Sequence, residues 1–238
     1  MGIIRGMSLT DSGMKLISEV IQDELNIPCL VMMGANLAQE VAEEQLCETT
    51  IGCENEENGQ LMKELFASPY FRCTAVNDKK TVELCGALKN VVGIGAGIVD
   101  GLNFGDNTKA AVIRLGLMEM IKFAEEFFPG GNTATFFESC GIADLVATCH
   151  GGRNRLLGES VVKSNKDGKY KTVKELEKEI LRGQSFQGPR IGREVYKMLE
   201  SKDMVDRFPL FTAVHKICER QMDPKEFIQC LRNHPEHM

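Results

Sequence analysis

The sequence predicts a mainly helical protein that begins with a small α/β portion. In the first 77 residues, segments with the 3.6-residue period of a helix alternate with short β-prone runs. This order is typical of a sheet layer covered by helices. From residue 78 onward, long helical periods follow one another and strand candidates are few. The two observations together predict an α/β segment followed by an all-helical portion.

The α/β segment is predicted element by element from residue periodicity. The first helical stripe consists of Met14, Ile17, Val20, Ile21 and Leu25. The apolar run 28–33 then predicts a buried strand that ends at Gly34. After it we expect a helix through 37–46, a strand over 49–53, a helix through 61–65 and a strand over 71–76.

The rest of the chain reads as a series of helices. Two long ones are expected through 82–95 and 111–123, the second capped by Asp106 or Asn107. Further helices are expected near 141–149, 153–163, 173–181, 188–201, 209–220 and 223–232. The lysine-rich run 163–174 favours a solvated surface loop.

Composition excludes several classes of protein. The chain has 28 Lys and Arg against 34 Asp and Glu, a net charge of −6, so no basic field is present to hold a nucleic acid. Its nine cysteines include no CxxC pair, which favours reduced thiols in a cytosol-like compartment over disulfides or a zinc site. The four histidines have no metal-ligand spacing, so no metal is expected. The start of the chain does not read as a secretion signal, and the most apolar stretch, 91–99, is too short to span a bilayer, so we expect a soluble protein.

The glycine-rich stretch 93–97 has two interpretations. It resembles a dinucleotide-binding loop, but such loops need GxGxxG after a strand, and Ile98 occupies the place where the third glycine would stand. The stretch also lies within a helical period. Close packing of helices through small residues is the favoured interpretation.

Lys89 also has two interpretations. It lies in an apolar helical run, where a lysine usually extends its ammonium group to water. Alternatively, the lysine is desolvated in a cleft, which lowers its pKa and lets it exchange a proton with a substrate oxygen. Asn90 beside it is able to hydrogen-bond the same substrate.

The segment 151–155, Gly-Gly-Arg-Asn-Arg, precedes a predicted helix and is either an anion site or a surface turn. Glycines allow close approach to the backbone, helix-start N–H groups point outward, and an arginine grips oxyanions with two hydrogen bonds. Upstream, Asp144 and Thr148 are four residues apart and so share a helical face.

The segment 183–189 is either a loop that closes over a ligand or a plain connector. Cys149 and His150 are adjacent on a helix and diverge, which argues against a catalytic dyad.

Five segments in this order resemble the NAD-dependent glycerol-3-phosphate dehydrogenases. They are 33–38, 47–52, 85–90, 105–111 and 151–154. The closing segment 233–237, Asn-His-Pro-Glu-His, is similar to the end of cytosolic eukaryotic members. The likeness covers nearly the whole chain.

The resemblance implies interconversion of sn-glycerol 3-phosphate and dihydroxyacetone phosphate with NAD. Lys89 matches the family's general acid/base, and Asn90, Asp144 and Thr148 complete the polar site around it. The residues implied to hold the substrate phosphate and neighbouring cofactor groups are Arg153 and Asn154, and those implied to contact NAD are Ala38 and Gln187.

The chain departs from the family pattern in several places. It contains no GxGxxG fingerprint, so it looks like the family without the first part of the Rossmann-type domain. Arg5 stands where the family has an early lysine near cofactor and substrate, which keeps the charge but not the geometry. Ser185 replaces a second family lysine, and 164–171 resembles a small insertion.

These inferences lead to one expected organisation. Residues 1–77 form the tail of an NAD-binding Rossmann-type domain, and residues 78–238 form a helical substrate and catalytic domain. We expect a cytoplasmic oxidoreductase that forms a homodimer through the helical domain, with no nucleic-acid or membrane partner. The alternative is a non-catalytic truncated form that serves as a binding or dimerisation module.

Overall fold

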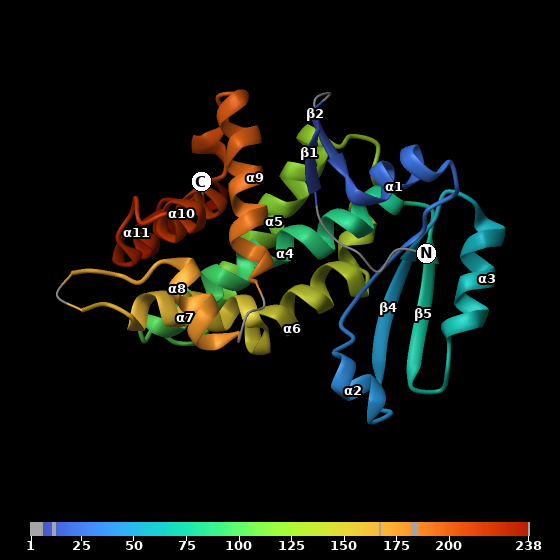
Figure 1. The fold of residues 1–238 in the computed structure, drawn as a ribbon, viewed down its shortest axis with the longest axis horizontal. Coiled ribbons are helices and arrows are strands. Elements are labelled where there is room, and N and C mark those ends of the chain that lie inside the picture. Colours follow the sequence, from blue (N-terminus) through green and yellow to red (C-terminus); the bar gives the residue numbers. More distant parts are fainter. Residues whose placement is uncertain (1–6, 11–12, 167, 182–184, 238) are drawn as a thin grey trace. The chain divides into compact units, whose positions relative to one another are not determined.

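The protein is described by a computed structural model covering residues 7–10, 13–166, 168–181 and 185–237 (Figure 1). The chain forms two compact units. Unit 1 contains Met1–Ala87 and Met120–Leu145, and unit 2 contains Leu88–Glu119 and Val146–Met238. The chain passes between the units within helices, so neither unit is one continuous stretch of sequence.

Unit 1 is built on a three-stranded sheet with the strand order β3-β4-β5. β3 (Val31–Met33) runs antiparallel to β4 (Cys47–Gly52), and β4 runs parallel to β5 (Phe71–Val76). The structure confirms the strand expected over 71–76 and, within two residues at its start, the strand expected over 49–53. Of the strand expected over 28–33, only the last three residues pair with β4.

Two predicted helices accompany this sheet. α2 (Ala38–Ala42) is shorter than expected, and α3 (Glu56–Phe66) follows β4. The Asn55 side chain caps α3 by accepting a hydrogen bond of 2.9 Å from the backbone N–H of Asn58. α3 and β5 lie next to each other (Figure 1).

The first helical stripe is only partly helical. β1 (Met7–Thr10) and β2 (Gly13–Leu16) form an antiparallel hairpin, and α1 (Ile17–Leu25) begins after it. The prediction was wrong for Met14, which lies in β2 opposite Leu9. A strand partner only a few residues away provides a hydrogen-bonding ladder that the apolar period alone does not reveal.

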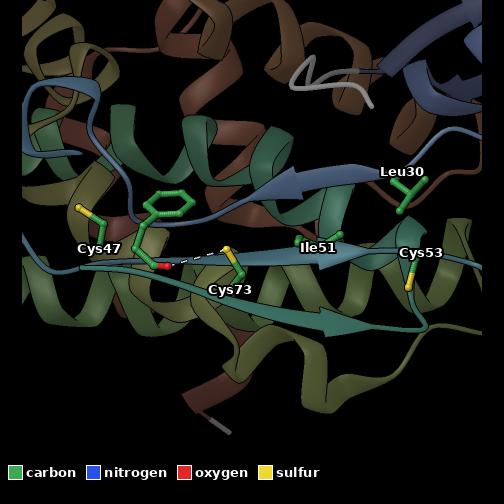
Figure 2. Packing of buried hydrophobic residues seen from close by; sticks show 6 residues of the cluster. Leu30, Cys47, Ile51, Cys53 and Cys73 are labelled. Carbon is green, nitrogen blue, oxygen red and sulfur yellow. Dashed lines mark hydrogen bonds between the residues drawn. The ribbon is translucent and has the colours of Figure 1, made fainter. Parts of the chain in front are cut away.

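The apolar core of the sheet is rich in thiols (Figure 2). Its buried members are Leu30, Cys47, Ile51, Cys53, Phe71 and Cys73. Met62 and Phe66 of α3 pack against this cluster, which shows that α3 covers the cluster's side of the sheet. All nine cysteines of the chain are free thiols, and eight of them are buried.

The two longest helices are α4 (Lys79–Gly101) and α5 (Asp106–Phe127). α4 is long and apolar enough to cross a membrane by length and composition, but its apolar window is entirely buried in the structure. Such burial is typical of a core helix. Because α5 begins at Asp106, both Asp106 and Asn107 lie inside its first turn, and the prediction that one of them caps the helix was wrong.

Among the described residues after α5, the remaining secondary structure is helical, apart from one isolated bridge between Lys166 and Lys169. The α-helices are α6 (Asp144–Gly151), α7 (Arg153–Lys163), α8 (Val173–Ile180), α9 (Gln187–Ser201), α10 (Pro209–Cys218) and α11 (Phe227–Arg232). A short π-helical segment, Ser139–Ala143, precedes α6. The structure therefore confirms an all-helical second portion. The expected loop over 163–174 is shorter than predicted, because Thr172 caps α8.

Glycines bring α4 and α7 into backbone contact. A Cβ on Gly97 would lie 1.9 Å from the carbonyl oxygen of Arg155, and one on Gly158 would lie 2.1 Å from the carbonyl oxygen of Ile94. Any larger residue would force the two helices apart. The stretch 93–97 thus serves helix packing, as its helical period indicated, and not a nucleotide loop.

A buried carboxylate joins three segments of unit 2. Glu119 of α5 accepts hydrogen bonds from the backbone N–H groups of Leu210 and Phe211 at 2.7 and 2.9 Å. His234 Nε2 lies 3.0 Å from the same carboxylate. Burial raises the pKa of Glu119, and these three partners oppose the rise. The closing segment of the chain is therefore anchored to α5 and α10.

Candidate active site

Lys89 lies in the middle of α4 and is 4% exposed. Its neighbours Leu88, Val91 and Val92 are fully buried. The structure therefore does not support the interpretation in which the lysine extends to open water.

The Asn154 side chain ties together the elements around Lys89. Its Nδ2 donates a hydrogen bond of 2.8 Å to Oδ1 of Asn90, the residue after Lys89 in α4. Its Oδ1 accepts a hydrogen bond of 3.0 Å from the backbone N–H of Gly188 in α9. Asn90 and Asn154 are both buried, so each of these bonds is protected from water. One amide thus links α4, the start of α7 and the start of α9 by hydrogen bonds.

Thr148 of α6 packs against the turn of α4 that follows Lys89. A Cβ on Gly93 would lie 2.8 Å from the Thr148 Cγ2 atom, so only glycine allows this approach. Gly93 is four residues after Lys89 and therefore lies on the same helical face. The backbone N–H of Gly152 donates to the Thr148 carbonyl at 3.2 Å and ends α6. Lys89, Asn90, Thr148 and Asn154 are buried polar residues of unit 2 on the elements that these contacts join, and we call them the lysine cluster.

Two exposed polar residues begin helices that the lysine cluster joins. Arg153 is the first residue of α7, and Gln187 is the first residue of α9. The hydrogen bond between Asn154 and Gly188 connects these two helix starts. A Cβ on Gly151 would meet nothing within 4 Å, so the space before Arg153 is open. A helix start with an exposed guanidinium and open space at Gly151 provides donors that a phosphate ester requires.

Other residues named in the sequence analysis lie in unit 1. Asp144, the first residue of α6, is buried there, and Ala38, the first residue of α2, is exposed. Because α6 includes both Asp144 and Thr148, the structure confirms that they lie one helical turn apart. Ser185 is exposed ahead of α9, and Arg5 lies outside the described residues.

A network of ion pairs that periodicity did not reveal supports the start of α7. Asp100 at the end of α4 contacts Lys109 of α5 and Arg155 of α7, each at 2.7 Å. Burial opposes ionisation of Asp100, but hydrogen bonds from Lys109 and Arg155 hold its pKa below its usual value. Arg155 also contacts Glu159 at 3.0 Å. The only signal in the sequence was charge at the ends of apolar helices, which does not identify partners.

Cys149 does not act with its neighbour His150. Burial raises the pKa of the Cys149 thiol to about 12, although the charges of Lys109 and Lys89 oppose the rise. The His150 Nδ1 lies 2.9 Å from the carbonyl oxygen of Val146, one turn back in the same helix. Within the described part of the chain, no group of three or more His, Cys, Asp or Glu side chains is placed to hold a metal ion.

The fold and these residues define a class of two-part proteins, in which a sheet-containing portion accompanies a helical portion that carries a buried lysine. The family model for the C-terminus of NAD-dependent glycerol-3-phosphate dehydrogenase matches residues 78–229. The model for the N-terminus of the same family matches residues 1–59. The chain belongs to the NAD-dependent glycerol-3-phosphate dehydrogenase family.

Curated relatives agree with this assignment. The chain is 56% identical over 237 residues to the cytoplasmic glycerol-3-phosphate dehydrogenase [NAD(+)] of Drosophila ezoana. It is 57% identical over the same length to the protein of that name from Homo sapiens. Both matches cover 99% of this chain and 66% of the relative, so the chain spans slightly less than two thirds of the length of these relatives.

Solved structures show the same fold. A glycerol-3-phosphate dehydrogenase of Dunaliella salina matches with a TM-score of 0.91 and 41% identity, covering 95% of this chain and 39% of that one. The glycerol-3-phosphate dehydrogenase of Plasmodium falciparum matches with a TM-score of 0.90 and 41% identity, covering 97% of this chain and 64% of that one.

Proposed function

We propose that this chain carries the substrate site of an NAD-dependent glycerol-3-phosphate dehydrogenase that interconverts sn-glycerol 3-phosphate and dihydroxyacetone phosphate. The lysine cluster is the observation that carries the proposal. A buried ammonium and fixed amides are what a ketone needs when its oxygen gains a proton. An exposed arginine at the start of a helix supplies hydrogen-bond donors and positive charge for a phosphate dianion.

In this proposal Lys89 is the general acid and base. During reduction its ammonium gives a proton to the oxygen at C2 of dihydroxyacetone phosphate, and during oxidation the neutral amine takes the proton from the C2 hydroxyl. When bound, NADH supplies the hydride for C2 and NAD accepts it in the opposite direction. Exclusion of water around Lys89 strengthens the interaction of the ammonium with the substrate oxygen.

The neighbouring residues bind and orient the substrate. Asn154 donates one N–H of its amide to Asn90 and accepts from Gly188 through Oδ1, so it holds Asn90 and the start of α9 in place and presents Arg153, the preceding residue, at the start of α7. We assign the substrate phosphate to Arg153 and Asn154, and polar contacts near the reacting carbon to Asn90, Asp144 and Thr148. The ion pairs of Asp100 with Lys109 and Arg155 then hold the start of α7 in position.

Polar side chains of this chain are suited to bind the nicotinamide end of NAD. The exposed Gln187 amide and Arg153 guanidinium offer donors for the nicotinamide end and adjacent phosphate, and we also assign Ala38 and Arg5 to cofactor contact. No GxGxxG segment is present to receive the pyrophosphate. We infer that residues 1–77 contribute the later part of an NAD-binding domain and residues 78–238 the substrate domain.

We further propose a cytoplasmic location, as in the names of the relatives, and a homodimer formed through the helical portion. The mass of the purified protein in solution, measured by sedimentation, tests the dimer. A protein that stays monomeric at micromolar concentration contradicts it.

An activity assay tests the function. A chimera carries the part of the human relative outside the match, joined to this chain. It should oxidise NADH with dihydroxyacetone phosphate and release sn-glycerol 3-phosphate, with dihydroxyacetone a far poorer substrate. A folded chimera without turnover would favour the second candidate, a non-catalytic binding or dimerisation module.

A further inference from the structure

The outer edge of β5 offers unpaired peptide groups. β5 is the last strand of its sheet and has β4 as its one neighbour among the described residues (Figure 1). The carbonyls of Tyr70 and Val76 accept hydrogen bonds of 2.8 and 3.0 Å from β4 and the residue after it. In a parallel ladder alternate residues bond to the same neighbour, so Cys73 and Ala75 direct their N–H and C=O groups away from β4.

The turn before β5 fixes where this open edge begins. The backbone N–H of Phe71 donates to the Ser68 hydroxyl at 3.0 Å, and the Phe71 carbonyl accepts from the Ser68 N–H at 3.0 Å. The outward groups of Phe71 are therefore already used. The edge available to another strand runs from Cys73 to Ala75 and beyond.

The sequence of β5 does little to protect this edge. Proteins usually block an edge strand with proline, lysine, a bulge or a covering element. β5 reads Phe-Arg-Cys-Thr-Ala-Val, in which the exposed Arg72 is the one charged residue and neither proline nor lysine occurs. It pairs with β4 in unbroken register along its whole length. Such an edge is a template for an added strand.

A groove of about 640 Å³ lies between this edge and α3. Its lining includes Glu56, Glu57, Leu61, Lys63, Glu64 and Ala75. Three carboxylates and one ammonium make the groove negative. Leu61 is 57% exposed and Leu65, one turn further along α3, is 68% exposed, which leaves apolar surface beside the charges.

We propose that the β5 edge and this groove bind an extended, basic peptide segment of another protein, which adds a strand to the sheet. Main-chain hydrogen bonds to Cys73 and Ala75 supply the pairing. Lysine or arginine side chains at alternate positions reach the α3 carboxylates, and apolar parts of the segment cover Leu61. A second copy of this chain fits less well, because pairing two β5 edges would bring like-charged α3 carboxylates together.

Two peptides of opposite charge test the proposal. The probe is an acetylated Lys-Val-Lys-Val-Lys-Val peptide, and the control is the matched Glu-Val-Glu-Val-Glu-Val peptide. We expect the basic peptide to bind at least about tenfold more tightly, with an affinity that falls as salt rises. We also expect it to slow amide hydrogen exchange at Cys73 and Ala75. Equal binding of both peptides, or protection elsewhere in the chain, would overturn the proposal.

Variants separate the two parts of the interaction. Ala75→Pro removes an outward N–H without removing a bond to β4, and should weaken binding of the basic peptide. Glu57→Gln with Glu64→Gln should remove most of the preference for the basic peptide. Glu40→Gln with Glu44→Gln changes two exposed carboxylates outside the groove and should leave binding unchanged.

The folded state and oligomeric state of each variant complete the test. Circular dichroism and thermal melting identify a variant that has lost its fold, and the carboxylate variants then decide the result alone. Unchanged peptide binding in folded Glu57→Gln with Glu64→Gln contradicts the proposal. A concentration-dependent dimer that Ala75→Pro abolishes would assign the edge to a second copy instead.

Discussion

The contact of α4 with α7 in unit 2 and the β5 edge in unit 1 show opposite uses of the backbone. In unit 2, glycines let two helices approach until backbone meets backbone, and Asn154 adds hydrogen bonds to Asn90 and Gly188. In unit 1, the sheet ends with peptide groups that no described residue pairs. Catalysis requires a substrate held in fixed geometry, which closely packed helices provide. Addition of a strand requires unpaired backbone groups, which the edge of β5 provides.

The largest effect should come from the lysine cluster. Lys89→Ala in the chimera should lower kcat by roughly 10²–10⁴-fold, because the proposed general acid is lost. Steady-state kinetics measures this change, and thermal melting shows whether the variant stays folded. Lys174→Ala alters an exposed lysine of α8 and should leave kcat unchanged. A kcat for Lys89→Ala within a few fold of the parent would remove Lys89 from the proposed mechanism.

A buried carboxylate in unit 1 should make stability depend on pH. Burial raises the pKa of Glu83 from 4.5 to about 7, and the backbone N–H of Ser18, which donates at 3.2 Å, opposes the rise. The folded state therefore holds a proton that the unfolded state has released, so stability falls as pH rises from about 4.5 toward 7. Above pH 7 the free energy of unfolding should be about 3 kcal/mol lower than below pH 4.5.

The variant Glu83→Gln isolates this contribution. It keeps an acceptor for Ser18 and removes the ionisation, so it should unfold at a higher denaturant concentration than the parent at pH 8 and show a flatter pH profile. Urea unfolding between pH 5 and pH 8 measures both. A parent profile with the same slope as the variant would show that Glu83 does not titrate in this range.

Close packing of α4 against α7 at Gly97 predicts the next largest effect, a loss of stability when this glycine is replaced. Gly97→Ala places a methyl group against the Arg155 carbonyl, so the helices must separate, at a cost of about 1–3 kcal/mol of unfolding free energy. Gly105→Ala is the matched control, because a Cβ there meets nothing within 4 Å. Similar melting temperatures for the two variants would contradict the close packing of α4 and α7.

A smaller effect is expected at the start of α7. Arg153→Lys keeps the charge but loses the paired hydrogen bonds of the guanidinium, and should raise KM for dihydroxyacetone phosphate about tenfold. Turnover of unphosphorylated dihydroxyacetone should change little. Equal effects on the two substrates would show that Arg153 does not bind the phosphate.

Much of the fold could be predicted from local pattern. β5 and α7 have their predicted bounds, and the glycine stretch 93–97 lies in a helix as its period indicated. Met14 was misassigned because its strand partner decides its structure. The orientation of β3 relative to β4 likewise depends on pairing across the sheet, which the apolar run 28–33 does not encode.

The candidate site divides in the same way. Lys89 was identifiable because a charge in an apolar helical run is unusual, and the segment 151–154 because glycines precede an arginine. Asn154 bonds to Asn90 and Gly188, 64 and 34 residues away in the chain, and such partners follow only from the packed fold. The contacts of Asp100 with Lys109 and Arg155 escaped prediction for the same reason.

Parallel calorimetric titrations of the 238-residue chain with dihydroxyacetone phosphate and with NADH test the central claim directly. The proposed substrate donors Arg153 and Asn154 lie together in α7, whereas the chain contains no GxGxxG turn for the pyrophosphate. We predict measurable binding of dihydroxyacetone phosphate and NADH binding far weaker than micromolar. A micromolar dissociation constant for NADH, about −8 kcal/mol, or no binding of dihydroxyacetone phosphate, would contradict the account.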